Sequence, residues 1–454
     1  MPAKHGHSAK RPSLSAKWRS LPANWHRLPL AVLLAVVAGA VSYSLIPSAA
    51  IAPVADRLSP QVFAASALGN LLGQGQVSSV GTLPAPLVTA TAKASTAAHA
   101  PKPKHSPHPS SSATAGGTTL ADAAGLGFYD GLSSPTGIET AATWLGSPSS
   151  VKYAEDFIDA TDWTHISTPW QLPNWKGSPF SMVWGVPMLP CGSPSTQCAT
   201  NVADYNLVAT GGADSYYVTL AQNLVAAGFG TSYIRLGWEF NADWMGWSIC
   251  NQGDSGLASW AKDFVPAFQN IVTSMRSVVG ANFKFVWNPL ESSNVSCPGV
   301  HLENYYPGDK YVDVIGLDVY DGLGQTVSSN AARWSDMLNG LNGGEWTAET
   351  PLAINGQKFK GYGLDWLTAF GKEHNKLVSI PEWGLVVNQD GNGGGGDDAY
   401  FVSHMASWIK ANATGPAIFW NYGDGNLPLD IPNYTSANTP DATAAFKAAF
   451  STGN

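Results

Sequence analysis

The chain has 454 residues, of which 44% are hydrophobic and 12% are charged. This composition excludes general disorder and suffices for one large domain with appendages. The formal net charge is −8, but residues 119–454 carry 14 basic and 31 acidic residues, a difference of −17. This excess of acidic residues in 119–454 argues against nucleic acid as the partner.

The amino-terminal stretch has the pattern of a targeting segment. Residues 1–27 contain six Lys or Arg and no acid, and residues 28–46 form an uncharged, mostly apolar run. Such a run is just long enough to cross a bilayer, whereas "AIA" at 50–52 suits signal cleavage. We therefore expect a basic cytoplasmic amino terminus at 1–27, and a signal peptide or single membrane anchor at 28–52. Both alternatives predict a secreted or cell-surface protein.

Residues 53–118 are predicted to be a low-complexity linker. Their second half is rich in Pro, Ala, Ser and Thr and has almost no large apolar side chains. Burial cannot offset the entropy of ordering such a segment, so we expect a disordered tether. The folded domain is accordingly placed at residues 119–454.

All four cysteines lie in that domain, and an even number in an exported protein predicts two disulfides. Three pairings are possible. The short loop between Cys191 and Cys198 makes that pair the easiest to close, which leaves Cys250 and Cys297. A metal site built from all four is the alternative, but the chain has no CxxC pair.

From residue 125 onward, short runs rich in β-branched and aromatic residues alternate with helical stretches. We expect strands at residues 125–131, 151–159, 181–189, 231–240, 283–289, 312–320, 377–384 and 417–422. Helical periodicity is clearest at 213–228, 259–280 and 397–412. Eight strands alternating with helices predict an α/β fold, a (β/α)8 TIM barrel.

Chemistry in such a barrel occurs at the carboxyl ends of the strands. Glu239 falls at that end of the fourth strand, and Glu382 at that end of the seventh. Two carboxylates across a barrel mouth are what retaining glycoside hydrolysis needs, one as acid and one as nucleophile. Asp130, Glu155 and Asp156 end the first two strands, and we expect them to bind substrate or support the barrel.

Three segments in order resemble glycoside hydrolase family 26 of clan A, the family best known for β-mannanases. They are "RLGWEFNADWMGW" at 235–247, "YYPGDKYVDVIGLDVYD" at 305–321 and "IPEWG" at 380–384. The resemblance extends over roughly residues 125–450, and the combination of the three segments is more specific than any one of them.

The resemblance implies roles for individual residues. Glu239 matches the general acid/base, Glu382 the nucleophile, Arg235 the barrel arginine, and Tyr320 the tyrosine that hydrogen-bonds the nucleophile. Trp238 departs from the pattern: the family usually has His there and the wider clan Asn, at a position that contacts the sugar at the cleavage point.

Tryptophan is unusually common, with 16 of 18 beyond residue 119. Aromatic faces stack on the apolar faces of sugar rings, so those near the mouth predict a carbohydrate cleft. We expect substrate contacts from Trp238, Trp244, Trp247, Trp287, Trp383 and Trp420, besides Arg235 and Tyr320. Trp420 is the expected platform beneath the cleaved sugar, and core packing is the alternative for tryptophans in helices, such as Trp260 and Trp408.

Polar residues at other strand ends leave two interpretations open. Asn288, Asp318 and Asp321 could bind sugar hydroxyls or hold the barrel together. The glycine-rich loop at 391–398 should overhang the site, as a lid or as a plain loop. No His or Asp spacing fits a metal motif and no glycine-rich turn fits a nucleotide, so we expect neither metal nor cofactor.

The sequence as a whole predicts a monomeric retaining glycoside hydrolase acting on a β-linked polysaccharide. Endo-β-1,4-mannanase is the first expectation through the resemblance; mixed-linkage β-glucanase or β-1,3-xylanase are the enzymatic alternatives. A non-catalytic surface barrel that binds glycans is the alternative from another class. That alternative would not need both Glu239 and Glu382.

Overall fold

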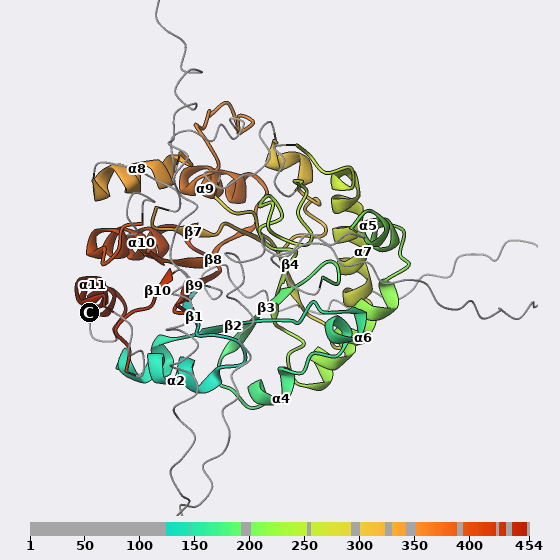
Figure 1. Ribbon diagram of the computed structural model, residues 1–454, viewed down its shortest axis with the longest axis horizontal. Coiled ribbons are helices and arrows are strands. Elements are labelled where there is room, and N and C mark those ends of the chain that lie inside the picture. Colours follow the sequence, from blue (N-terminus) through green and yellow to red (C-terminus); the bar gives the residue numbers. More distant parts are fainter. Residues whose placement is uncertain are drawn as a thin grey trace, which may run out of the picture. The chain divides into compact units, whose positions relative to one another are not determined.

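The computed structural model describes the greater part of the carboxyl-terminal domain. Its described residues are 124–146, 148–191, 201–251, 256–291, 300–322, 329–341, 351–387, 394–423, 426–432 and 438–451. The predicted amino terminus, targeting segment and linker, residues 1–118, lie outside them. Figure 1 shows these described residues as a central sheet surrounded by helices.

The central sheet is a closed barrel of parallel strands. They are β1 (Gly125–Tyr129), β2 (Tyr153–Phe157), β3 (Ser181–Val186), β4 (Tyr233–Leu236), β5 (Lys284–Trp287), β6 (Val314–Gly316), β7 (Val319–Tyr320), β8 (Leu377–Val386) and β9 (Pro416–Trp420). Each strand from β1 to β5 pairs with the next, β8 pairs with both β6 and β7, and β9 closes the ring against β8 and β1. β6 and β7 together act as one interrupted strand, so the predicted eight-stranded barrel is confirmed.

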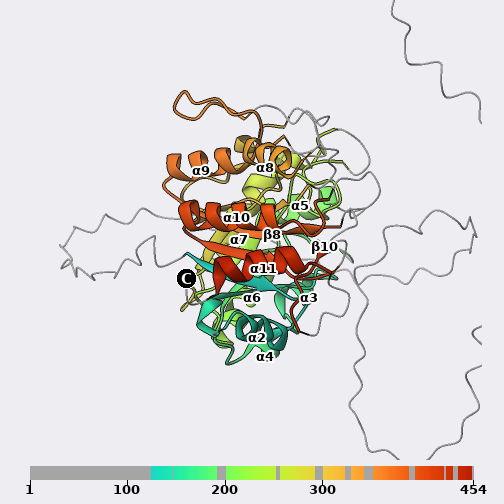
Figure 2. The same ribbon diagram turned by 90° about the vertical axis from the view of Figure 1, so that its left-hand side faces the viewer.

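Helices cover the outside of the barrel. They are α2 (Pro135–Trp144), α3 (Trp163–Ser167), α4 (Leu172–Trp175), α5 (Asn201–Ala209), α6 (Asp214–Ala226), α7 (Phe264–Arg276), α8 (Asn330–Asn339), α9 (Leu364–Glu373), α10 (Ala399–Asn412) and α11 (Pro440–Phe450). Single 3-10 turns lie at η3 (Pro148–Ser150), η4 (Ala261–Asp263) and η6 (Leu302–Tyr305), and the short β10 (Asn426–Leu427) pairs antiparallel with the end of β8. The three helices expected from periodicity correspond to α6, α7 and α10. Figure 2 shows α9, α10 and α11 one above another on one flank.

The strands are buried on both faces, as parallel strands covered by helices must be. All five residues of β2 are buried, and so are nine of the ten in β8. Successive side chains point to opposite faces of a strand. In β8, Glu382 points into the barrel, whereas Trp383 packs outward against Phe446 of α11 with ring centroids 5.7 Å apart. This alternation decides which residues can reach the site.

Several predictions concern segments that the structure describes only in part. Cys191 and Cys250 are buried and neither is a free thiol. Cys198 and Cys297 lie outside the described residues, so the pairing stays a prediction, and so does the role of loop residues 391–393. Within the described ranges no helix has the length and apolar character to cross a membrane, and the expected anchor at 28–46 lies outside them.

Candidate active site

Polar side chains from four strand ends meet inside the carboxyl-terminal end of the barrel. Tyr320 ends β7, Asp318 lies between β6 and β7, and Asn288 directly follows β5. Glu382 lies within β8, and Glu239 lies three residues beyond the end of β4. Parallel strands bring their carboxyl ends to the same rim, which is how residues far apart in sequence come together.

The turn after β4 has an unusual backbone conformation. Gly237 and Glu239 have φ values of 55° and 51°. The left-handed region is sterically unfavourable for a residue with a Cβ, at roughly 1–2 kcal/mol, and such strain persists where surrounding contacts hold it. The Glu239 N–H donates to the Asn288 carbonyl oxygen at 2.8 Å, which ties the turn to β5. A Cβ on Gly237 would lie 2.4 Å from the Met188 sulfur, so the turn also requires glycine.

Three acids lie within reach of one another. Glu239, Asp318 and Glu382 each place a carboxylate oxygen within 4.8 Å of the other two, and all three side chains are buried. Acids at this spacing could ligate a cation. Here Arg235 already supplies a positive charge to two of them, so we interpret the cluster as acid/base machinery.

Arg235 of β4 is the centre of the site and is fully buried. Its Nη1 donates to Glu155 Oε1 at 3.0 Å and to Glu382 Oε1 at 2.5 Å. Its Nη2 donates to Asp318 and its Nε to Asn288. A guanidinium presents its donors in a fixed planar fork, so it sets the positions of these side chains relative to one another.

Two donors hold Glu382. The Tyr320 hydroxyl donates to Oε2 at 2.5 Å, and Arg235 donates to Oε1. These two hydrogen bonds fix the position and orientation of the Glu382 carboxyl group, as a nucleophile requires. Burial, followed by the charge of Glu382, raises the pKa of Tyr320 well above its usual value, so Tyr320 stays a phenol that can donate.

Glu239 has the opposite character. Burial raises its pKa from 4.5 to about 8, and the charge of Glu382 adds to the effect. Arg235 and hydrogen bonds with Trp244 and Asp318 lower that pKa in part. Glu239 therefore keeps its proton at neutral pH, as a general acid must. One buried pair thus combines a carboxyl group with a raised pKa and a carboxyl group held by two hydrogen-bond donors.

Aromatic rings form a wall on one side of the acids. We call Tyr129, Phe157, Trp238 and Trp420 the aromatic wall. Centroid distances are 4.0 Å for Tyr129–Trp420, 5.7 Å for Phe157–Trp420 and 4.9 Å for Phe157–Trp238. Trp420 is partly exposed, and Trp238 is 5% exposed. Trp244 is also partly exposed and hydrogen-bonds Glu239. These rings are in a position to contact a ligand held at the acids.

The sequence predicts sugar contacts for three tryptophans that the structure buries completely. The Trp247 indole N–H donates to the Trp238 carbonyl oxygen at 2.7 Å, and the Trp287 N–H donates to the Tyr305 carbonyl oxygen at 3.1 Å. Trp383 faces the helices. None of the three has an exposed ring face, so in this structure they pack the core, and Trp247 supports the turn that carries Glu239.

The remaining candidate acids differ in whether their side chains point into the barrel or away from it. Glu155 points inward to Arg235. Its neighbour Asp156 points outward and accepts from the Trp175 indole N–H at 2.6 Å. Asp130 accepts from Asn421 at 3.1 Å. None of these contacts involves the Glu239–Glu382 pair except through Arg235.

Sequence reasoning missed the importance of Glu155 and Phe157. Both belong to β2, in which every residue is buried. An acid inside a fully buried strand signals a charged partner inside the barrel, and the alternation of faces would have separated Glu155 from Asp156. The guanidinium carbon of Arg235 lies 5.6 Å from the centroid of the Phe157 ring, so Phe157 covers the arginine as part of the aromatic wall.

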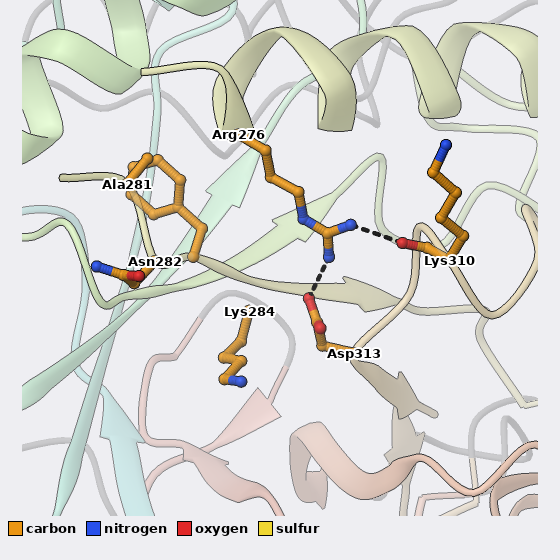
Figure 3. A pocket seen from close by; sticks show the side chains of 7 residues that line it. Arg276, Ala281, Asn282, Lys284, Lys310 and Asp313 are labelled. Carbon is orange, nitrogen blue, oxygen red and sulfur yellow. Dashed lines mark hydrogen bonds and ion pairs between the residues drawn. The ribbon is translucent and has the colours of Figure 1, made fainter. Parts of the chain in front are cut away.

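Figure 3 shows a pocket elsewhere, of about 480 Å³, at the amino end of β5. It is lined by Arg276, Ala281, Asn282, Lys284, Lys310 and Asp313, besides Phe283. Arg276 pairs with Asp313 at 2.7 Å and donates to the Lys310 carbonyl oxygen at 2.6 Å. The pocket has no pair of acids, and it opens at the end of the barrel away from Glu239. We therefore place the candidate site at the carboxyl end.

Comparison with known proteins bears on this site. Residues 196–358 match the family model described as Glycosyl hydrolase family 26. This segment of the barrel is similar to glycoside hydrolase family 26. The matched segment includes Arg235, Glu239 and Tyr320, and it ends before Glu382. The match therefore confirms the family resemblance for the segment that carries Arg235, Glu239 and Tyr320.

Individual similar proteins cover different shares of the chain. Endoglucanase H of Acetivibrio thermocellus is 33% identical over 133 residues, 29% of this chain and 14% of that protein. Among solved structures, GH26C from Muricauda sp. MAR_2010_75 is 16% identical, covering 72% of this chain and 86% of that one, with a TM-score of 0.45. Bacillus subtilis mannanase BCman is also 16% identical, covering 71% and 87%, with a TM-score of 0.43.

Proposed function

We propose that this protein is a retaining glycoside hydrolase that cleaves a β-linked polysaccharide, with Glu239 as general acid/base and Glu382 as nucleophile. The observation that carries the proposal is the buried pair itself: the two acids have oxygens within 4.8 Å, burial raises the pKa of Glu239 to about 8, and Glu382 accepts hydrogen bonds from Tyr320 and Arg235. Retaining enzymes need carboxyl groups about 5–5.5 Å apart, whereas inverting enzymes need about 6.5–9.5 Å to admit a water.

The first step joins the sugar to Glu382. Glu239 gives its proton to the glycosidic oxygen as the bond to the anomeric carbon breaks. A carboxylate oxygen of Glu382 bonds to that carbon, and the shortened chain leaves as an alcohol. Tyr320 and Arg235 hold the carboxylate in place for the attack.

The second step uses the same residues in reverse. Once Glu382 is an ester it has lost its negative charge, which is one of the causes that raise the pKa of Glu239. The Glu239 pKa therefore falls in the intermediate, and its carboxylate can take a proton from an attacking water. Water bonds to the anomeric carbon, the ester bond breaks, and both acids return to their first state.

The aromatic wall is the proposed surface for the sugar chain. Trp420, braced by Tyr129 at 4.0 Å, has the partial exposure that stacking on a sugar ring requires. Trp238 makes the surface beside Glu239 apolar, whereas the family usually has a polar residue at this position. We propose that Trp238 and Trp244 bound the sugar at the cleavage point.

We propose two polymers as substrates. β-1,4-Mannan follows from the family resemblance. β-Glucan, including the mixed-linkage form, is the second candidate because the relative at 33% identity carries the name endoglucanase. We further propose that the protein is exported, either secreted or anchored by residues 28–46, on the strength of the basic and apolar amino-terminal pattern.

The test is release of reducing sugar by the full chain from mannan, mixed-linkage glucan, cellulose and β-1,3-xylan. Glu239→Gln and Glu382→Gln should abolish hydrolysis of the polymer that the unchanged protein cleaves. Glu139→Gln, the same change at an exposed position of α2, is the matched control and should leave it intact. No release from any polymer, or release that survives both site changes, would contradict the proposal and favour the glycan-binding barrel.

A further inference from the structure

The site contains four acidic side chains and one arginine, so the arginine cannot neutralise all four acids in their ionised form. Glu155, Glu239, Asp318 and Glu382 surround Arg235, and all five side chains are buried. With every acid ionised, four negative charges would face one positive charge in a largely buried site. Burying an uncompensated charge is unfavourable enough that such groups bind protons instead. Some of these acids must therefore be neutral.

The hydrogen bonds distinguish Glu382 from Glu155 and Asp318, each of which has one buried oxygen without a hydrogen-bond partner in the described part of the chain. Glu382 has a donor on each oxygen, from Arg235 and Tyr320. Glu239 holds the catalytic proton. Glu155 accepts from Arg235 with Oε1 alone, and its Oε2 is buried without a hydrogen-bond partner in the described part of the chain. A bare, buried oxygen is far less costly on a neutral carboxyl group than on a carboxylate.

Glu155 and Glu382 also share one nitrogen. Arg235 Nη1 donates to Oε1 of both, at 3.0 Å and 2.5 Å. An ionised Glu155 would divide the charge of that nitrogen between two carboxylates and would place a second negative charge beside the nucleophile. A neutral Glu155 accepts the same hydrogen bond through its carbonyl oxygen and leaves the charge to Glu382.

We propose that Glu155 is a positioning residue that remains a neutral carboxylic acid in the working enzyme and holds Arg235 against Glu382. This inference rests on the proposed function for its catalytic meaning. Burial raises the pKa of Glu155 well above its usual value; Arg235 opposes that rise, and the charges of Glu382 and Asp318 add to it. These three are the charged groups that face Glu155, from β4, β8 and the β6–β7 junction.

The kinetic test compares two substitutions across a range of pH. Glu155→Gln keeps a neutral acceptor of the same shape, so kcat should stay within about threefold and the acidic limb of the kcat/KM profile should not move. Glu155→Leu removes the acceptor and releases Arg235, so kcat should fall at least about thirtyfold while KM changes less than about threefold. A Gln variant that loses activity as the Leu variant does, or shifts the acidic limb, would overturn the proposal.

A stability test needs no substrate, so it distinguishes failure of this inference from failure of the proposed function. If folded Glu155 keeps its proton, the unfolded chain alone loses that proton once the pH exceeds the ordinary glutamate pKa. The folded state of the unchanged protein then loses stability relative to Glu155→Gln as the pH rises.

Thermal unfolding of the full chain at pH 4 and pH 7 measures this effect. The Tm of Glu155→Gln minus that of the unchanged protein should increase by at least about 2 °C between the two values. If the Tm difference between Glu155→Gln and the unchanged protein is the same at both pH values, or is smaller at pH 7, Glu155 is ionised in the folded state. Glu139→Gln, at an exposed position, is the control and should show no change with pH.

Discussion

Replacing Trp244 by Phe should extend activity to higher pH. Trp244 hydrogen-bonds the Glu239 carboxylate and thereby lowers its pKa, which burial raises to about 8. A hydrogen bond to a charged group contributes about 1.5 kcal/mol at the low end, the value suited to a partly exposed partner. At 1.36 kcal/mol per pKa unit, its loss should raise the pKa of Glu239 by about one unit. The general acid then keeps its proton to correspondingly higher pH.

The assay is kcat/KM measured from pH 5 to 10, because that parameter reports the free enzyme. The basic limb of the unchanged protein should fall near pH 8, and the Trp244→Phe variant should place it about one unit higher. Trp260→Phe is the matched control, because it loses an indole N–H that donates to the Ser248 carbonyl oxygen at 2.8 Å. If the basic limb of the Trp244→Phe variant stays at the same pH or moves to lower pH, or if the control shifts equally, Trp244 does not lower the pKa of Glu239.

Three further outcomes follow from the same contacts. Arg235→Met leaves buried carboxylates without their cation and should cost about 3–5 kcal/mol of folding free energy, seen as a lower Tm; an unchanged Tm would contradict the central role of Arg235. Trp420→Ala should raise KM for the polymer about tenfold by removing the sugar platform, and a KM within twofold would exclude that role. Gly237→Ala sets a Cβ 2.4 Å from the Met188 sulfur at a φ of 55°. It should destabilise the protein by about 1–3 kcal/mol in denaturant titrations, whereas full stability would show that the turn can relax.

Much of the barrel could be predicted because its strands are short apolar runs of similar length, separated along the sequence by helical stretches. The fourth strand shows the limit: the apolar run at 231–240 continues past the strand, which ends at Leu236. Glu239 therefore lies in a turn and not on the strand. No propensity predicts a left-handed glutamate, since that conformation depends on tertiary contacts such as its hydrogen bond to Asn288.

The aromatic residues were harder to assign than the acids. A tryptophan that binds sugar and one that fills the core have the same side chain, so their number near the site predicts a cleft without saying which rings face it. Alternation within β8 resolves one case, because an inward Glu382 requires an outward Trp383. The same alternation applies to Trp287, the last residue of β5, because the next residue, Asn288, points inward to Arg235 and Trp287 packs against Phe370 of α9. Trp247 had no such signal, since its burial depends on how the loop after β4 folds back.

The paired acids are also where sequence and structure agree most closely. Glu239 and Glu382 were selected by their places at two strand ends, 143 residues apart, and their oxygens meet within 4.8 Å. The charge balance around Arg235 could not be predicted, because it requires knowing that Glu155 and Asp318 point inward to the same guanidinium.

The most direct test of the account is to trap the covalent intermediate. The full chain would be incubated with 2-deoxy-2-fluoro-glycosyl fluorides of the manno and gluco series, whose fluorine slows release from the enzyme, and its peptides would be mapped by mass spectrometry. The expected result is one glycosyl group on Glu382, absent from Glu382→Gln. An adduct on another residue, or turnover of the polymer with inversion at the anomeric carbon, would contradict it.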